Sequence, residues 1–461
     1  MTDRLPSSPK AALGDQVTVT QTPSALAGAW RLVSCEAGRV SCLLIVETFV
    51  FVPYVASTMV DDLPAAQTVL ALCCTASGVF AAATGPLLCM VLRAPGSRRW
   101  ALAAVTALLS MLLLTLWWVR PDGGLDSTVA FVAIGLVNLF CVYRLVVEAT
   151  IGSALLGQRE ELRAVLDGAA VGNVVAAATL LALLWAFVWP GTVAWPFVPA
   201  QPLFGLNTLL YEPERASGPL MAATISLSAL PLLFWRRRSA HPQSAAGNQI
   251  DFVRDVGDLI RRHRGNRGFI YWILGRAALM GGLMTLILFG GIYASSDLKL
   301  SMATRYLTGA VILAGAGLGL VAHRALNQRL GPRATLRIEL ACVAGWTVVQ
   351  LGQSFLLMVL PKGIVVSILM ALAFLGSAAI LGASASGPSE PMDQVPEDSR
   401  RADAPVLLAS MTSWVGPLLV AIFTTLFRSV AAGLVPILVM IGVGFTALWF
   451  ANTPNERAPT A

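Results

Sequence analysis

The sequence predicts an all-α polytopic membrane protein with twelve transmembrane helices in two six-helix bundles. Of its 461 residues, 56% are hydrophobic and only 12% are charged, whereas soluble domains carry roughly 25% charged residues. Several apolar runs are longer than the roughly 18 residues that cross a hydrocarbon core of about 30 Å as a helix. The runs are continuous and do not alternate with polar residues, which favours helices over barrel strands.

Twelve apolar spans are expected, six on each side of a long basic segment. The first six are 38–60, 65–92, 100–119, 128–156, 168–189 and 217–235. The second six are 269–294, 302–323, 338–360, 364–384, 404–427 and 430–451. The two bundles therefore cover 38–235 and 269–451. The remaining segments are an N-terminal tail at 1–37, a linker at 236–268 and a C-terminal tail at 452–461.

Basic residues in the loops predict the orientation. With both termini in the cytoplasm, the cytoplasmic loops carry nineteen Lys and Arg residues and the opposite loops carry five. This split predicts a multi-pass protein of the cell inner (plasma) membrane with both tails cytoplasmic. The linker repeats apolar residues at helical spacing from Ile250 to Ile260, so a short amphipathic helix is expected at the membrane surface. For this linker, a role as a simple connector is favoured over a role in binding a partner.

Four charged residues fall well inside the expected spans: Glu47, Arg144, Glu148 and Arg276. A charge at mid-membrane costs at least about 2.5–3.5 kcal/mol on insertion scales, so each needs a reason. Glu47 and Glu148 are candidate proton-coupling carboxylates. Arg144 and Arg276 are candidate substrate-binding or gating groups, because a guanidinium can hold a carboxylate or phosphate with two parallel donors.

Structural alternatives stand beside these roles. Arg144 and Glu148 are four residues apart on one helical face and can simply neutralise each other, and Arg276 can reach the headgroups. Further polar residues that could line a substrate path, or simply pack in the core, are Tyr54, Asn138 and Tyr143.

The sequence lacks the motifs of metal binding and of nucleotide binding. The seven cysteines have no metal-ligand spacing with a histidine, and no Gly-x-x-x-x-Gly-Lys loop is present. We therefore expect no enzyme activity, no cofactor and no metal. The net charge of +7 is explained by the topology of the loops without a nucleic-acid partner. The expected partners are the lipid bilayer, a small-molecule substrate and protons.

Several short motifs carry a family likeness. Pro53 lies in Phe51-Val52-Pro53-Tyr54, and Gly290, Gly291 and Tyr293 lie in the seventh span. Gly331, Pro332 and Arg333 follow the eighth span, and Gly416 and Pro417 lie in the eleventh. In this order the motifs resemble the vacuole-effluxer-like branch of the major facilitator superfamily, which includes autophagy-related amino acid effluxers. The usual aspartate is missing between spans two and three, where Gly85-Pro86 leads to Arg93.

The resemblance implies a function. In such proteins the first, fourth, seventh and tenth helices line a central cavity, which would place Glu47, Arg144, Glu148 and Arg276 beside it. The expected function is secondary active transport of a small polar organic solute, an amino acid or related metabolite, by proton-coupled alternating access. Two alternatives remain open: efflux of amphipathic compounds, and a non-transporting assembly factor or sensor.

Overall fold

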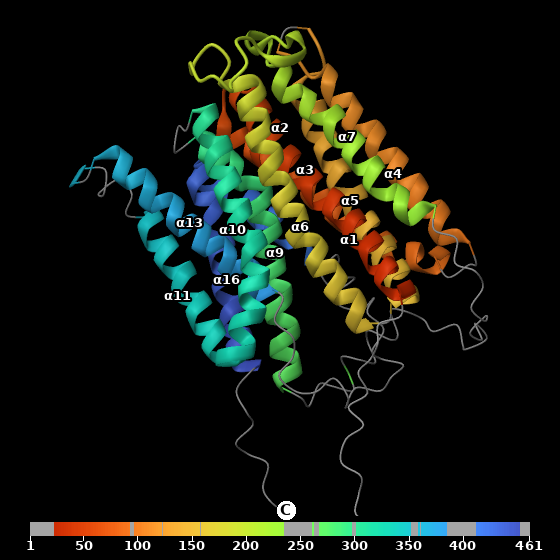
Figure 1. Cartoon of the computed structure of the whole chain (residues 1–461). Coiled ribbons are helices and arrows are strands. Elements are labelled where there is room, and N and C mark those ends of the chain that lie inside the picture. Colours follow the sequence, from red (N-terminus) through yellow and green to blue (C-terminus); the bar gives the residue numbers. More distant parts are fainter. Residues whose placement is uncertain are drawn as a thin grey trace, which may run out of the picture.

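The computed structural model describes residues 23–92, 96–121, 123–156, 158–234, 261, 267–296, 301–351, 358–359, 361–384 and 412–451. Within them every regular element is a helix, apart from an isolated bridge between Val119 and Leu125 (Figure 1). The elements of the first half are α1 (Pro23–Leu43), η1 (Leu44–Phe49), α2 (Phe51–Thr58), α3 (Leu63–Leu92), α4 (Ser97–Thr115), η2 (Leu116–Trp118), α5 (Ser127–Leu156), α6 (Gln158–Leu183), η3 (Leu184–Val188), η4 (Leu203–Gly205), η5 (Thr208–Leu210) and α7 (Glu212–Leu233). Those of the second half are α9 (Arg267–Ser296), α10 (Met302–Leu330), α11 (Pro332–Leu351), α13 (Lys362–Ser384), α15 (Val415–Phe427) and α16 (Val430–Ala451).

The predicted fold class is confirmed. In the described part of the chain, nine helical segments are long and apolar enough to cross a membrane, and Ser367–Ala383 and Val415–Phe427 are shorter apolar helices. The ninth expected span corresponds to α11, whose 20 residues match the length of a transmembrane helix. The helices therefore follow the expected order of twelve spans.

The first span differs from its expected limits. It was placed at 38–60 after a polar tail, but α1 begins at Pro23 and an apolar segment suited to a membrane runs over Ala27–Thr58. The charges of Glu36 and Arg39 made this stretch look like a tail. Both side chains are buried in the structure, because they pair with each other and with α5. The linker 236–268, apart from Arg261, Arg267 and Gly268, and the tail 452–461 lie outside the described residues.

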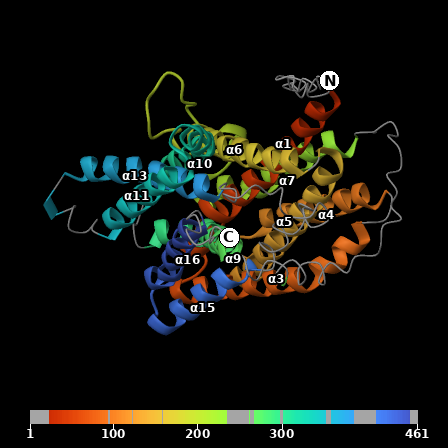
Figure 2. The same cartoon turned by 90° about the horizontal axis from the view of Figure 1, so that it is seen from below.

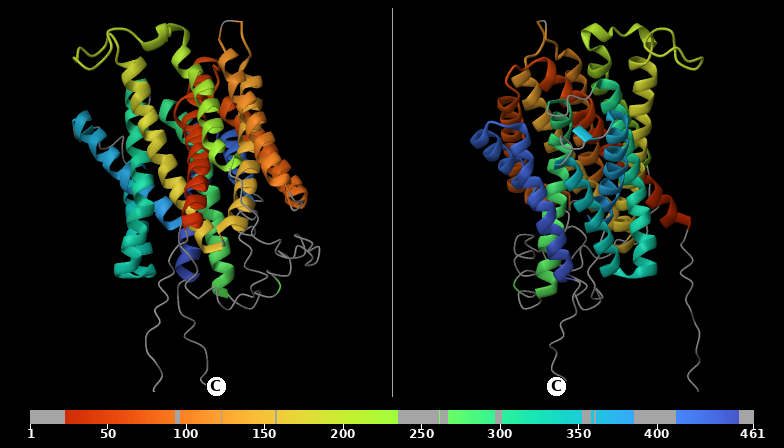
Figure 3. Two further views of the ribbon diagram at one scale, coloured as in Figure 1. Left: turned by 45° about the vertical axis from the view of Figure 1, so that its right-hand side comes forward. Right: turned by 90° about the vertical axis from the view of Figure 1, so that its left-hand side faces the viewer.

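The helices form two groups side by side, one from each half of the chain (Figure 2). In the first group α1 packs on α5, α6 and α7, and in the second α9 packs on α16 and α10 on α13. The most extensive contacts between the groups are those of α6 with α10, α3 with α15, and η1–α2 with α9. The start of α1 and the end of α16 lie at the same end of the molecule (Figure 3), which we name the termini end. The opposite end is named the far end.

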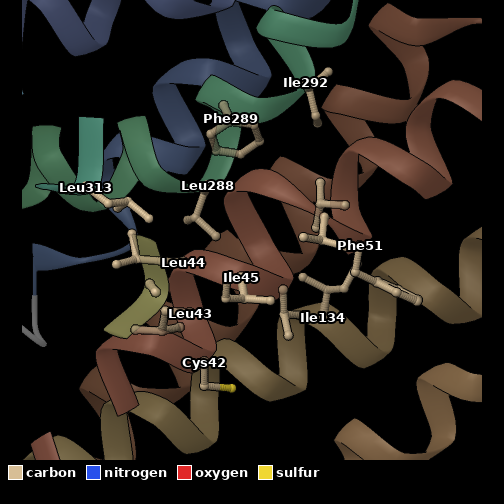
Figure 4. Packing of buried hydrophobic residues seen from close by; sticks show 14 of the residues in the cluster. Cys42, Leu43, Leu44, Ile45, Phe51, Ile134, Leu288, Phe289, Ile292 and Leu313 are labelled. Carbon is tan, nitrogen blue, oxygen red and sulfur yellow. The ribbon is translucent and has the colours of Figure 1, made fainter. Parts of the chain in front are cut away.

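The main buried cluster crosses the boundary between the two groups. Figure 4 shows Leu44 and Ile45 of η1 facing Leu288 and Phe289 of α9, with Leu313 of α10 beside them. All five side chains are buried. Both halves of the chain therefore share one continuous apolar core around the η1 segment.

Candidate functional site

The candidate site centres on a break in the first membrane helix. Between α1 and α2 the chain forms a π-helical turn, Leu44–Phe49, in which the Val50 amide donates to the carbonyl oxygen of Ile45 over 3.0 Å. Pro53 follows within one turn, and because proline has no N–H it cannot close the usual helical bond to Phe49. Isolated π-helical turns occur frequently at functional sites.

Glu47 lies in the middle of this turn. It is 1% exposed, and its Oε1 atom has no hydrogen-bond partner among the described residues. The thiols of Cys74 on α3 and Cys141 on α5 lie near it, and Asn138 on α5 lies near Cys74. Glu47 is therefore a buried carboxyl among thiols and apolar side chains, and no arginine in the described chain pairs with it.

The residue after Glu47 joins the two bundles. The Thr48 hydroxyl donates to the carbonyl oxygen of Ile287 on α9 over 2.7 Å. On the same helix, a methyl group added at Gly291 would lie 1.6 Å from the carbonyl oxygen of Thr48 and 2.8 Å from Cγ of Pro53. Only a glycine permits this approach, so Gly291 and Pro53 of the family-like motifs meet at the boundary between the bundles.

A second set of charges is buried within the first bundle, nearer the termini end. Arg144 on α5 is fully buried and donates from Nε to Glu148 Oε1 over 2.6 Å. Its other nitrogens donate to the carbonyl oxygen of Ile225 at 3.1 Å, to the hydroxyl of Ser228 at 3.1 Å and to the carbonyl oxygen of Cys35 at 3.3 Å. Protein acceptors from α1, α5 and α7 therefore surround the guanidinium. This agrees with the structural alternative, in which Arg144 and Glu148 neutralise each other.

Three residues of this network are absent from the sequence-based candidates. Arg39 forms an ion pair with Glu36 and lies 3.6 Å, Nε to Oε2, from Glu148. The Cys35 thiol donates to Glu148 Oε1 over 3.0 Å, so this cysteine is more than an apolar filler. The spacing of Glu36 and Arg39, three residues apart on one helical face, is the signal that could have revealed them.

The charged groups of the first span lie at two depths. Glu36 and Arg39 lie at the level of Glu148 and its partner Arg144. Glu47 comes eight residues after Arg39 on the same helical segment, which corresponds to about 12 Å of helix rise. The two sets of charges are separate sites.

The remaining candidates lie at several places. Arg276 on α9 lies over the Trp272 ring, with 5.8 Å from its guanidinium carbon to the ring centroid. Tyr54 lies towards the far end and donates to the carbonyl oxygen of Val119 over 3.2 Å. Tyr143 hydrogen-bonds Thr84 on α3. The structure does not bring these side chains to one point.

Most of the other motif residues shape helix ends and close contacts. Gly331 ends α10 with φ +80°, a conformation that favours glycine, and Pro332 and Arg333 begin α11. A methyl group at Gly416 would overlap the Thr285 hydroxyl of α9, and Pro417 follows in α15. Gly290 has space around it and Tyr293 is half-buried.

Two ion pairs on α10 were not anticipated from the sequence. His323 Nδ1 lies 2.7 Å from Glu339 Oε1 of α11, and both side chains are buried. The next residue, Arg324, pairs with Asp167 on α6 over 2.5 Å and so connects the two bundles near the termini end. Both partners lie on other helices, so residue spacing along α10 does not reveal these pairs.

Comparisons with known proteins bear on the fold. No family model and no curated protein matches the sequence. Among solved structures, the chain is similar to a D-xylose–proton symporter (TM-score 0.59, 13% identity, 92% of this chain and 97% of that chain covered). It is also similar to the nucleoside transporter NupG (0.54, 12%, 94% and 100%). A third match is a bacterial homolog of the human lysosomal transporter Spinster in an inward-facing, occupied conformation (0.53, 14%, 93% and 96%). The chain therefore has the fold of major facilitator transporters.

Proposed function

We propose that this protein is a secondary active transporter that moves a small polar organic solute by alternating access, with Glu47 as its proton-responsive carboxyl. The fold supports transport, since the similar structures named above are transporters. The inner (plasma) membrane, with both termini in the cytoplasm, is part of this proposal and follows from the basic loops.

The observation that carries the proposal is the position of Glu47 beside the cross-bundle contact. Its carboxyl is buried without a basic partner, and a lone carboxylate in a low-dielectric surrounding favours its neutral form. The adjacent Thr48 holds α9 through Ile287. Separation of η1 from α9 would admit water to Glu47 and allow it to release its proton. Proton release and bundle movement are thereby linked in one short segment.

The surroundings of Arg144 bear on the choice of substrate. Because its nitrogens already meet protein acceptors, we assign Arg144 and Glu148 a structural role within the first bundle. A fixed cation for a substrate carboxylate would then have to come from Arg276. With that cation available, an amino acid or related metabolite stays one candidate substrate class.

A second substrate class is favoured by the composition of the Glu47 site. The carboxyl lies among Cys74, Cys141 and the apolar cluster, which suits a lipophilic cation better than a strongly hydrated solute. Efflux of amphipathic cations is therefore the second candidate function.

Ligand binding by the purified full-length protein tests the proposal. Thermal unfolding in detergent would be followed against amino acids, nucleosides, sugars, organic acids and lipophilic cations at pH 5.5 and 7.5. A ligand present at about 100 times its Kd adds about 2.7 kcal/mol to the free energy of unfolding. We expect stabilisation by one class, and proton movement with that ligand in proteoliposomes.

Variants then test the role of Glu47. Glu47→Gln should keep ligand binding but lose its pH dependence and the accompanying proton flux. Glu36→Gln is the matched control, because Glu36 is an equally buried carboxyl in the same span that pairs with Arg39. Unchanged proton coupling in Glu47→Gln would remove Glu47 from the mechanism. A folded protein that binds no compound of any class would favour the assembly-factor or sensor alternative.

A further inference from the structure

The connection between the fifth and sixth spans, residues 190–211, is unlike the other two far-end connections in the first half of the chain. It contains no Asp, Glu, Lys, Arg or His, whereas the α2–α3 connection contains Asp61 and Asp62 and the α4–α5 connection contains Arg120 and Asp126. A long external loop without a charge has no electrostatic reason to lie in water.

Its apolar side chains point outward. Phe197, Phe204 and Leu209 are 84%, 89% and 85% exposed, and Trp195 is 61% exposed. Large exposed apolar patches mark surfaces that contact a partner or a membrane. These four residues define the surface that we name the far-end apolar loop.

The loop is held in place by specific contacts. The Trp185 indole of η3 donates to the carbonyl oxygen of Phe197 over 2.5 Å, and the rings of Trp189 and Trp195 pack with centroids 5.8 Å apart. At its other end the Leu209 amide donates to the Asn207 side chain over 2.8 Å. The outward position of the apolar side chains is therefore built into the loop.

The loop continues a surface that faces lipid. Leu181 and Trp185, one helical turn apart on the fifth span, are 45% and 40% exposed and point away from the bundle. The views in Figures 1, 2 and 3 agree that the loop projects sideways beyond α6 and α10 at the far end. It therefore overhangs the rim of the bundle, at the level where the headgroups of a surrounding bilayer lie.

We propose that the far-end apolar loop is a membrane-contact surface that lies on the bilayer interface, with Trp195, Phe197 and Phe204 inserted among the headgroups and upper acyl chains. Tryptophan gathers at this level because its ring is apolar while its indole N–H can donate to water or headgroups, and phenylalanine side chains bury in the adjacent upper acyl region. The partner is the lipid surface itself, and the proposal depends on the membrane-spanning fold alone, not on a substrate.

The loop also reaches the kinked first span. Tyr211 closes the loop with φ +53°, and its ring packs against Tyr54 of α2 with centroids 5.4 Å apart. A lipid contact at Phe197 and Phe204 is thereby connected through one short segment to the helix that follows Glu47.

Nitroxide labels in lipid nanodiscs test the proposal. The label is attached at Phe197→Cys and Phe204→Cys, with Asp61→Cys as the matched control at the same end and the unaltered chain as the background from its own cysteines. Collisions are measured with oxygen, which concentrates in lipid, and with a nickel chelate, which stays in water. We expect the ratio of oxygen to nickel accessibility to be several-fold higher at the two loop positions than at Asp61→Cys.

Two results would overturn the proposal. A nickel accessibility equal to that of Asp61→Cys would place the loop in water. Protection from both reagents would mean that protein covers the loop, either a second copy of this chain or another partner. If the Phe197→Cys protein does not fold, Leu209→Cys replaces it, since Leu209 is equally exposed and lies nearer the other end of the loop.

Discussion

Arg324 and Asp167 form an ion pair between the two bundles, with 2.5 Å between Nη1 and Oδ1. Their side chains are 33% and 44% exposed, so water and salt screen the attraction and the expected coupling energy is about 1 kcal/mol or less. Asp167→Asn and Arg324→Gln should each shift the equilibrium towards separation of the bundles at the termini end. The exchanged pair, Asp167→Arg with Arg324→Asp, should restore part of the coupling. Thermal unfolding of the wild type, the two single variants and the exchanged pair at about 0.1 M and 1 M salt measures the coupling energy. A coupling energy that does not fall at high salt would contradict a screened pair.

Gly291 predicts a strong steric effect. Gly291→Ala would place a methyl group 1.6 Å from the carbonyl oxygen of Thr48, so α9 and η1 must move apart, at an expected cost of about 1–3 kcal/mol. Gly290→Ala is the control, because its methyl group would meet only Leu286 at 3.8 Å. Thermal unfolding measures the cost, and label accessibility at Glu47→Cys measures the opening. Equal behaviour of the two variants would mean that the bundles do not meet closely there.

The Arg144 network predicts a structural role. Arg144→Gln should lower the free energy of unfolding by about 3–5 kcal/mol, because it leaves Glu148 buried with a weaker counter-charge. Arg144→Met combined with Glu148→Leu should recover much of that loss, since the buried charges are then removed together. Unfolding by denaturant in the same detergent compares the two. A stable Arg144→Gln protein that had lost ligand binding would instead restore Arg144 to the substrate site.

The buried pair on α10 and α11 gives a graded prediction. His323→Phe leaves the Glu339 carboxyl without its partner, whereas Glu339→Gln keeps a hydrogen bond to His323, so the first variant should be the less stable by at least about 1 kcal/mol. Gly382→Ala should also destabilise, because its methyl group would lie 2.6 Å from Glu339 Oε1. Gly345→Ala on α11 has open space and serves as the control. Equal stability of His323→Phe and Glu339→Gln would show that the pair contributes little.

The sequence predicts the fold well because membrane spans depend on local composition. Long apolar runs and basic loops locate the helices without any knowledge of tertiary contacts. The start of α1 was missed for the opposite reason, since Glu36 and Arg39 are tolerated in a membrane helix only through partners such as Glu148 on another helix. The same limit applies to His323 and Arg324, whose partners lie on α11 and α6.

The site was identified in part. Glu47 was selected as a charge well inside an apolar span, and the structure shows an unpartnered buried oxygen there. Its distance from Arg144 could not be predicted, because the depth of every group in the first span depends on where that helix begins. The role of Gly291 depends on a close approach between helices that lie more than 200 residues apart in sequence, which no local pattern indicates.

The contact between α6 and α10 has a consequence for motion. Gly309 lies against Leu180, Gly317 against Val174, and Arg324 against Asp167, so these two helices touch at three levels along their length. Between the first span and α9, the Thr48 hydroxyl donates to Ile287, and Gly291 packs against Thr48 and Pro53. If one bundle rotated about the line of the α6–α10 contact, that contact would change little. The helices farthest from it would move the most. The α6–α10 contact therefore has the geometry of a rotation axis between the two bundles.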